Sequence, residues 1–125
     1  MPPHEKPSPG DMTIDEMQDH IDKLIAELRA TRFPLEDDFH VHWIDDPEGA
    51  FAITASDPVE IHIPRVRSVD SYVTCLHELG HVAGRYQRSR NGKTREYWAW
   101  RYAREHALSW TAEMESIASR YKPYR

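Results

Sequence analysis

The segment from Ser68 to Arg85 carries a strong helical pattern, and two glycines lie on one side of it. Apolar residues recur there every three or four positions, the period of one helix face, and they are Val69, Tyr72, Val73, Leu76, Leu79 and Ala83. Ser68 is a residue type that commonly caps a helix N-terminus. Beside the apolar face lies a stripe with small side chains, formed by Val73, His77, Gly80, His81 and Gly84. We therefore expect a helix over residues 68–85, approached closely by a second backbone at the glycines.

The same segment contains the sequence His77-Glu78-Leu79-Gly80-His81, an H-E-x-x-H motif. Residues four apart on a helix stand on the same face, so His77 and His81 can place two imidazoles on one metal ion. Glu78 follows the first histidine and can act as general base toward a water at that ion. Zinc in a catalytic site needs a further protein ligand and keeps one position open. The motif predicts one zinc ion per chain; the alternative is that both histidines are ordinary core or surface residues.

Two more helices are expected, one on each side of this part of the chain. Thr13 and Glu16 form a capping box, and an amphipathic pattern continues from there to about Thr31. A long C-terminal helix is expected from about Thr94 to Arg120.

Alternating apolar and polar residues predict three short strands, at residues 39–44, 50–54 and 59–63. Their close connections favour an antiparallel sheet, in which we expect the third strand to be the exposed edge that receives a peptide. The strands carry three histidines, His40, His42 and His62, which we expect to be exposed rather than to bind metal. The expected fold class is α+β, with an N-terminal helix, a small sheet, the motif helix and a long C-terminal helix.

Composition limits the remaining choices. The 125 residues suffice for one domain, which we place at residues 12–125, after a disordered leader at 1–11 that holds four of the nine prolines. The net charge of −5 gives no overall nucleic-acid footprint. Cys75 is the single cysteine, so no internal disulfide forms, and we expect it to be a small buried hydrophobe. Without an apolar run of membrane-spanning length or a secretory signal, a cytoplasmic location is expected, with no membrane partner.

The third metal ligand has two candidates on the last helix. Glu96 shares a helical stripe with small residues, Ala99, Ala103 and Ala107, which can pack closely on the glycines of the motif helix. Glu105 belongs to a bulkier stripe and can instead pair with Arg101 at i, i+4 spacing. Glu96 is therefore the preferred ligand and Glu105 the alternative. Gln87 stands where another class of metallopeptidase has a third histidine, but glutamine is a poor zinc ligand.

The motif segment Leu76–His81 together with residues 96–103 resembles the ImmA/IrrE-type metallopeptidases. Their second pattern is E-x-x-A-N-x-F-A, which Glu96, Ala99, Tyr102 and Ala103 match, with tyrosine for phenylalanine and Trp100 at the asparagine position. The resemblance covers about residues 59–110. It implies a compact zincin-like fold, with His77, His81 and Glu96 as zinc ligands and Glu78 as the catalytic residue. It also implies a protein substrate of the repressor-like class.

A second resemblance is to the zincin domain of antirestriction proteins, in which Tyr102-Ala103-Arg104-Glu105 would align and Glu105 would be the ligand. Three functions follow from the sequence. The first is a zinc endopeptidase acting on a protein or peptide. The second is an inactive zincin-like interaction module. The third is an antirestriction or toxin-type protein associated with nucleic acid, favoured by seven basic residues within 85–104. No sequence feature predicts an oligomeric state.

Several side chains are candidates for stabilising a tetrahedral oxyanion, besides nearby arginines. They are Tyr72, Tyr97 and His106.

Overall fold

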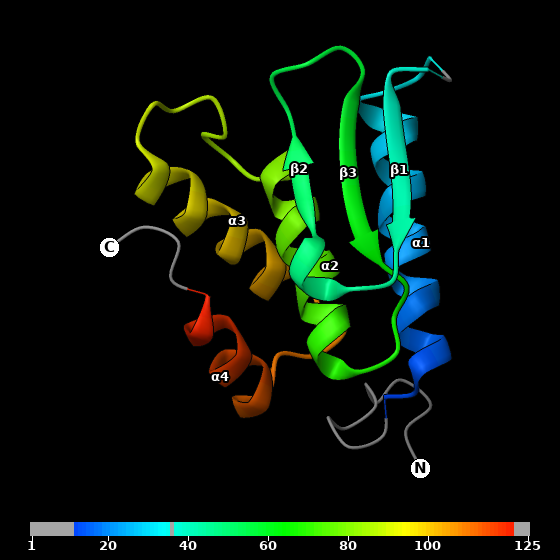
Figure 1. Cartoon of the computed structure of the whole chain (residues 1–125), viewed down its shortest axis with the longest axis vertical. Coiled ribbons are helices and arrows are strands. Elements are labelled where there is room, and N and C mark those ends of the chain that lie inside the picture. Colours follow the sequence, from blue (N-terminus) through cyan, green and yellow to red (C-terminus); the bar gives the residue numbers. More distant parts are fainter. Residues whose placement is uncertain (1–11, 36, 122–125) are drawn as a thin grey trace.

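The computed structural model describes residues 12–35 and 37–121. The predicted leader at 1–11 lies outside the described residues. The elements follow in the order α1 (Ile14–Thr31), β1 (Phe39–Ile44), the 3-10 helix η2 (Pro47–Gly49), β2 (Phe51–Ile53), β3 (Val59–Pro64), α2 (Val69–Ala83), α3 (Gly92–His106) and α4 (Ala112–Arg120). The described part of the chain is therefore α+β, with helices and a small sheet (Figure 1). None of its helices is both long enough and apolar enough to cross a membrane.

The sheet is mixed, so the expectation of an antiparallel sheet is wrong. Its strand order is β1-β3-β2, with β3 parallel to β1 and antiparallel to β2. Residues 45–58, which contain η2 and β2, carry the chain past the central position and leave that position to β3. A parallel pair needs a connection of this kind, and alternation along a strand carries no information about direction. The central place of β3 also corrects its predicted role as the edge; the edges are β1 and β2.

The predicted caps and helix positions account for α1 and α2. Thr13 and Glu16 form the expected capping box at the start of α1, and Ser68 caps α2 by accepting a hydrogen bond from the Ser71 backbone. α2 is buried on almost every side and contacts α1, β3, α3 and α4. Cys75 is fully buried on α2, as expected, and its thiol lies 3.0 Å from the carbonyl oxygen of Pro64. Figure 1 shows α2 at the centre of the molecule, between the α1–sheet unit and the two C-terminal helices.

The predicted C-terminal helix is two helices, α3 and α4, which meet at an angle (Figure 1). Residues 107–111 form the corner, and Thr111 caps α4 by accepting a hydrogen bond from the Met114 backbone. Arg104 donates two hydrogen bonds to the Glu115 carboxylate, at 2.9 and 2.8 Å, and so joins the two helices. Periodicity missed the break because the buried residues of α4 continue the apolar pattern. The signal was Thr111 followed by an acidic first turn, which is typical of a helix start.

Candidate metal centre

His77 and His81 lie one turn apart on α2, and both direct Nε2 toward one carboxylate of α3. His77 Nε2 is 2.7 Å from Oε2 of Glu96, and His81 Nε2 is 3.1 Å from Oε1 of the same residue. The ligand atoms of the three residues all lie within 4.8 Å of one another. Two imidazoles and a carboxylate form a donor set that suits a transition-metal ion. The group His77, His81 and Glu96 could therefore hold a metal ion.

Close packing between α2 and α3 brings Glu96 to the histidines. A Cβ atom added to Gly80 would collide with the backbone of Ala99, and one added to Gly84 would lie 2.9 Å from the carbonyl oxygen of Trp98. Only hydrogen in place of a side chain allows the two backbones to lie so close. The expected approach of a second backbone at these two glycines is confirmed.

Glu105, the alternative ligand, lies outside this group. Its side chain is exposed, and its Oε1 accepts a hydrogen bond of 2.8 Å from Arg101 Nε. This i, i+4 pair is the one that the sequence suggested. The structure thus brings Glu96 to His77 and His81, and leaves Glu105 on the surface of α3.

The contacts within this group shift the pKa values of Glu96 and His81. Burial alone would raise the pKa of Glu96, but the contacts with His77 and His81 outweigh it and lower that pKa to about 2. For His81, burial acts to lower the pKa, while hydrogen bonds with Glu96 and Gln87 raise it above the usual 6.5. An anionic carboxylate thus faces the Nε2 atoms of both imidazoles. A divalent cation between these three groups would meet one negative charge and two nitrogen donors.

The two histidines differ in what lies behind them. His81 Nδ1 is 3.0 Å from Oε1 of Gln87, and the Gln87 amide donates to the carbonyl oxygen of Arg95 at 2.9 Å and of Arg85 at 3.2 Å. Both amide donors are therefore engaged, so Oε1 is left to accept from the Nδ1–H of His81. This contact favours the tautomer whose free electron pair is on Nε2, facing Glu96.

His77 is held by packing rather than by a hydrogen bond at its second nitrogen. Its Nδ1 is a buried polar atom without a hydrogen-bond partner in the described part of the chain. The nearest carboxylate oxygen, Oε2 of Glu78, is 3.5 Å away. The Trp100 ring stacks on the imidazole at 4.0 Å between centroids.

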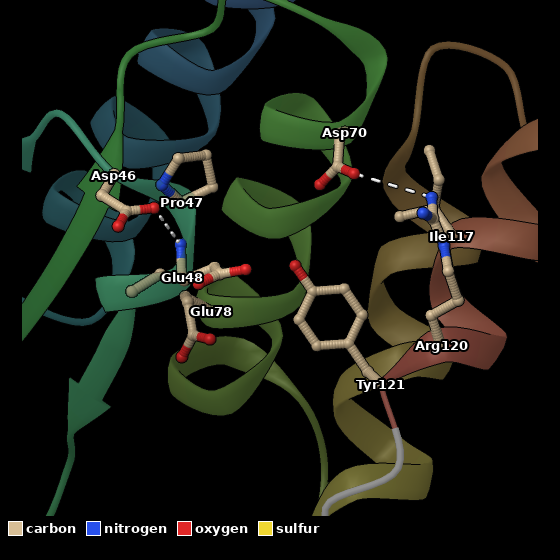
Figure 2. Close-up of a pocket in the computed structure, with 9 residues that line it drawn as sticks. Asp46, Pro47, Glu48, Asp70, Glu78, Ile117, Arg120 and Tyr121 are labelled. Carbon is tan, nitrogen blue, oxygen red and sulfur yellow. Dashed lines mark hydrogen bonds and ion pairs between the residues drawn. The ribbon is translucent and has the colours of Figure 1, made fainter.

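Glu78 is buried, with 7% of its surface exposed, and burial raises its pKa. A raised pKa suits a carboxylate that has to accept and return a proton near neutral pH. Glu78 borders a cleft of about 590 Å³ between η2, α2 and the end of α4. Figure 2 shows this cleft, with Tyr121 opposite η2 and an ion pair between Asp70 and Arg120 at its rim.

A second cleft, of about 550 Å³, also borders Glu78. Its wall includes the three candidate ligands and residues 50–52 and 54, which cover most of the edge strand β2. Glu78 and Tyr121 line both clefts. Glu78, the carboxylate that the motif assigns to proton transfer, is therefore accessible from both clefts.

Two residues of this site, Tyr121 and Gln87, were not predicted in their roles from the sequence. Tyr121 follows α4, and only the unexpected corner before that helix brings it back to α2, where its hydroxyl lies 2.6 Å from Thr74 Oγ1. Gln87 was weighed as a ligand and lies instead behind His81. Of the expected oxyanion donors, Tyr72, Tyr97 and His106 line neither cleft, whereas one arginine lines each, Arg95 the cleft with the ligands and Arg120 the other. The Tyr72 hydroxyl, for example, is engaged by His20 and by the backbone of Leu108.

Comparisons of the chain with known protein families, with curated proteins and with solved structures found no significant match. Support for a function therefore comes from the residues of the site.

Proposed function

We propose that this chain is a zinc metallopeptidase of the zincin-like kind that hydrolyses peptide bonds of a protein substrate. His77, His81 and Glu96 would hold the zinc ion, and Glu78 would be the general base. The observation that carries the proposal is the convergence of His77 Nε2, His81 Nε2 and the Glu96 carboxylate beside the buried carboxyl group of Glu78. A three-ligand set next to an open cleft is typical of catalytic zinc rather than structural zinc, which takes four protein ligands.

The zinc ion and the residues of the chain would have different roles in the reaction. A zinc ion held by these ligands supplies a Lewis acid and lowers the pKa of a water toward neutrality. Glu78 accepts the proton of the attacking water and returns it to the leaving amine. Because its pKa is raised toward neutral pH, the carboxyl group can both accept and release a proton more readily there. Gln87 keeps His81 oriented during the reaction through a hydrogen bond, and Trp100 keeps His77 oriented through stacking.

A substrate peptide would bind in extended form along β2. This strand is a sheet edge, and residues 50–52 and 54 line the cleft that contains the three ligands. Edge strands offer unpaired backbone groups to an added strand. The repressor-like class of substrate comes from the family resemblance of residues 59–110 and remains part of the proposal.

The two other functions have weaker support. An interaction module does not need a buried carboxyl group of raised pKa that borders two clefts, and Glu78 is such a group. The basic stretch at 85–104 supports nucleic-acid binding less than its composition suggests. Arg101 is paired with Glu105, and Arg104 with Glu115.

Cleavage mapping with one variant tests the proposal. Zinc-loaded protein is incubated with an unfolded protein substrate, and the products are mapped by mass spectrometry. Glu78→Gln should bind zinc like the unchanged chain but cleave about 100- to 10,000-fold more slowly. Glu105→Gln, an exposed acid of the same type, is the matched control and should cleave normally. Cleavage by Glu78→Gln at the normal rate would contradict the proposal, and zinc binding without any cleavage by the unchanged chain would favour the interaction module.

A further inference from the structure

A second cluster of metal-binding side chains lies on the outer face of the sheet. The parallel register of β1 and β3 places His40 opposite Glu60 and His42 opposite His62. Phe39 and Ile61, which neighbour them along the two strands, are buried in the core. Because successive side chains on a strand point to opposite faces, the histidines and Glu60 share the face turned away from the core.

Three of these side chains converge. The ligand atoms of His40, His42 and Glu60 all lie within 4.8 Å of one another. His42 Nε2 is 2.9 Å from Oε1 of Glu60, and the His40 and His42 rings lie 6.2 Å apart at an angle of 76°. Two imidazoles two residues apart on one strand, with a carboxylate from the neighbouring strand, can face a single ion without a change in the backbone.

Stacking holds the His42 ring in this position. The His62 ring lies 4.3 Å from the His42 ring, tilted by 14°, and Phe51 of β2 covers the other side of His62 at 4.1 Å. The column of three rings therefore extends across all three strands. It restricts the rotation of His42 and lowers the entropy that the side chain loses when it binds a ligand.

We propose that His40, His42 and Glu60 form a second metal site, for zinc or a similar divalent transition-metal ion, that ties β1 to β3. Imidazole nitrogens suit these ions, whereas calcium and magnesium prefer sites built from oxygen alone. The site shares no residue with the centre on α2 and α3 and does not depend on the proposed peptidase activity. The side chains of His42 and Glu60 are 44% and 31% exposed, so water completes the coordination and the affinity is lower than at the α2–α3 centre.

A variant that lacks the α2–α3 centre isolates the proposed site. His77→Ala/His81→Ala protein is titrated with zinc at micromolar concentrations, and bound metal is measured by calorimetry and by elemental analysis after dialysis. We expect it to bind one equivalent and the unchanged chain to bind two. Adding His40→Gln and His42→Gln to the double variant should abolish the remaining equivalent. His106→Gln is the control, because His106 belongs to neither group. This substitution should leave the remaining zinc equivalent bound.

Two further readouts separate binding at this site from loss of the fold. Zinc should shift the NMR signals of the His40 and His42 rings in the His77→Ala/His81→Ala protein and raise its melting temperature. Glu60→Gln keeps a neutral partner for His42 but removes the carboxylate, so it should weaken zinc binding while circular dichroism stays normal. The proposal is overturned if the His77→Ala/His81→Ala protein, folded by circular dichroism, binds no zinc. It is also overturned if adding His40→Gln and His42→Gln to the His77→Ala/His81→Ala protein leaves its one zinc equivalent bound.

Discussion

The Trp100 ring lies parallel to the imidazole of His77, at 4.0 Å between centroids and an angle of 4°. His77 is almost fully buried, and its Nδ1 has no hydrogen-bond partner in the described part of the chain. An aromatic face at this position fixes the plane of the ring without using a polar group. The residue that stacks on His77 is thus the one at which the sequence departs from the ImmA/IrrE pattern, which has an asparagine there.

Replacing Trp100 should therefore loosen the metal centre as well as the core. Trp100→Ala should lower the free energy of unfolding by about 3–5 kcal/mol, as expected for a buried tryptophan. It should also weaken zinc binding by about tenfold or more, as expected when a group that orients a ligand is lost. Trp100→Phe keeps an aromatic face and should restore most of the zinc affinity. Zinc titration of both variants, below their melting temperatures, checks this; equal affinities would show that the stacking is not needed.

The choice of third ligand is tested by two matched glutamate variants. Glu96→Ala should weaken zinc binding by at least about 10- to 100-fold, the loss that is typical of removing even a supporting residue. Glu105→Ala should leave it unchanged because Glu105 pairs with Arg101 on the surface. The measurement is the zinc dissociation constant of each variant, determined against a competing chelator. If Glu105→Ala releases zinc and Glu96→Ala does not, the antirestriction-type alignment is the better one.

Gln87 should act on zinc through His81. Gln87→Ala removes the acceptor for the His81 Nδ1–H and should weaken zinc binding by about 10- to 100-fold. Gln87→Glu keeps an acceptor for that N–H but loses both amide donors, and its second oxygen would face the carbonyl oxygens of Arg85 and Arg95, so part of the affinity should be lost. If Gln87 acts through the Nδ1–H of His81, Gln87→Ala should weaken zinc binding more than Gln87→Glu. The zinc dissociation constants of the two variants check this, and equal losses would indicate a purely structural role.

Gly80 should tolerate no side chain. Gly80→Ala forces a Cβ atom against the Ala99 backbone, and we expect a loss of about 1–3 kcal/mol in the free energy of unfolding, as for other overpacked cores. Because α3 has to move away from α2, zinc affinity should fall too. Gly49→Ala is the matched control, since its added Cβ would lie 3.6 Å from the nearest side-chain atom, Ile44 Cδ1, an ordinary contact. Chemical denaturation of both variants gives the comparison.

Zinc affinity should fall as the pH falls, and His81 sets part of this dependence. Its pKa is raised in the metal-free protein, so His81 holds a proton up to a higher pH than an ordinary histidine. Zinc binds the neutral imidazole and has to displace that proton. Glu96, with a pKa of about 2, stays ionised and does not contribute near neutral pH. Zinc titrations at a series of pH values between about 5 and 8 check this; an affinity independent of pH would contradict it.

Local patterns were sufficient for the motif helix and for its approach to α3. The capping residues Thr13 and Ser68 and the placement of His77 and His81 on one face all follow from the spacing of residues along the chain. The glycines of α2 and Ala99 of α3 predicted that the two backbones meet, and the structure confirms it. The proximity of Glu96 to the histidines follows from the same packing. These features could be predicted because each depends on residues within one helix or on the size of facing side chains.

The tertiary structure alone decided the strand order, the corner before α4 and the contacts of Gln87 and Tyr121. It also decided the cluster on the outer face of the sheet. His40 and His42 had been expected to be merely exposed, and Glu60 joins them only because β3 pairs with β1 in parallel. Alternation along a strand states which side chains share a face, but not which strand lies beside it or in which direction. That choice depends on the free energy of many contacts between residues far apart in the chain, and no short stretch of sequence contains it.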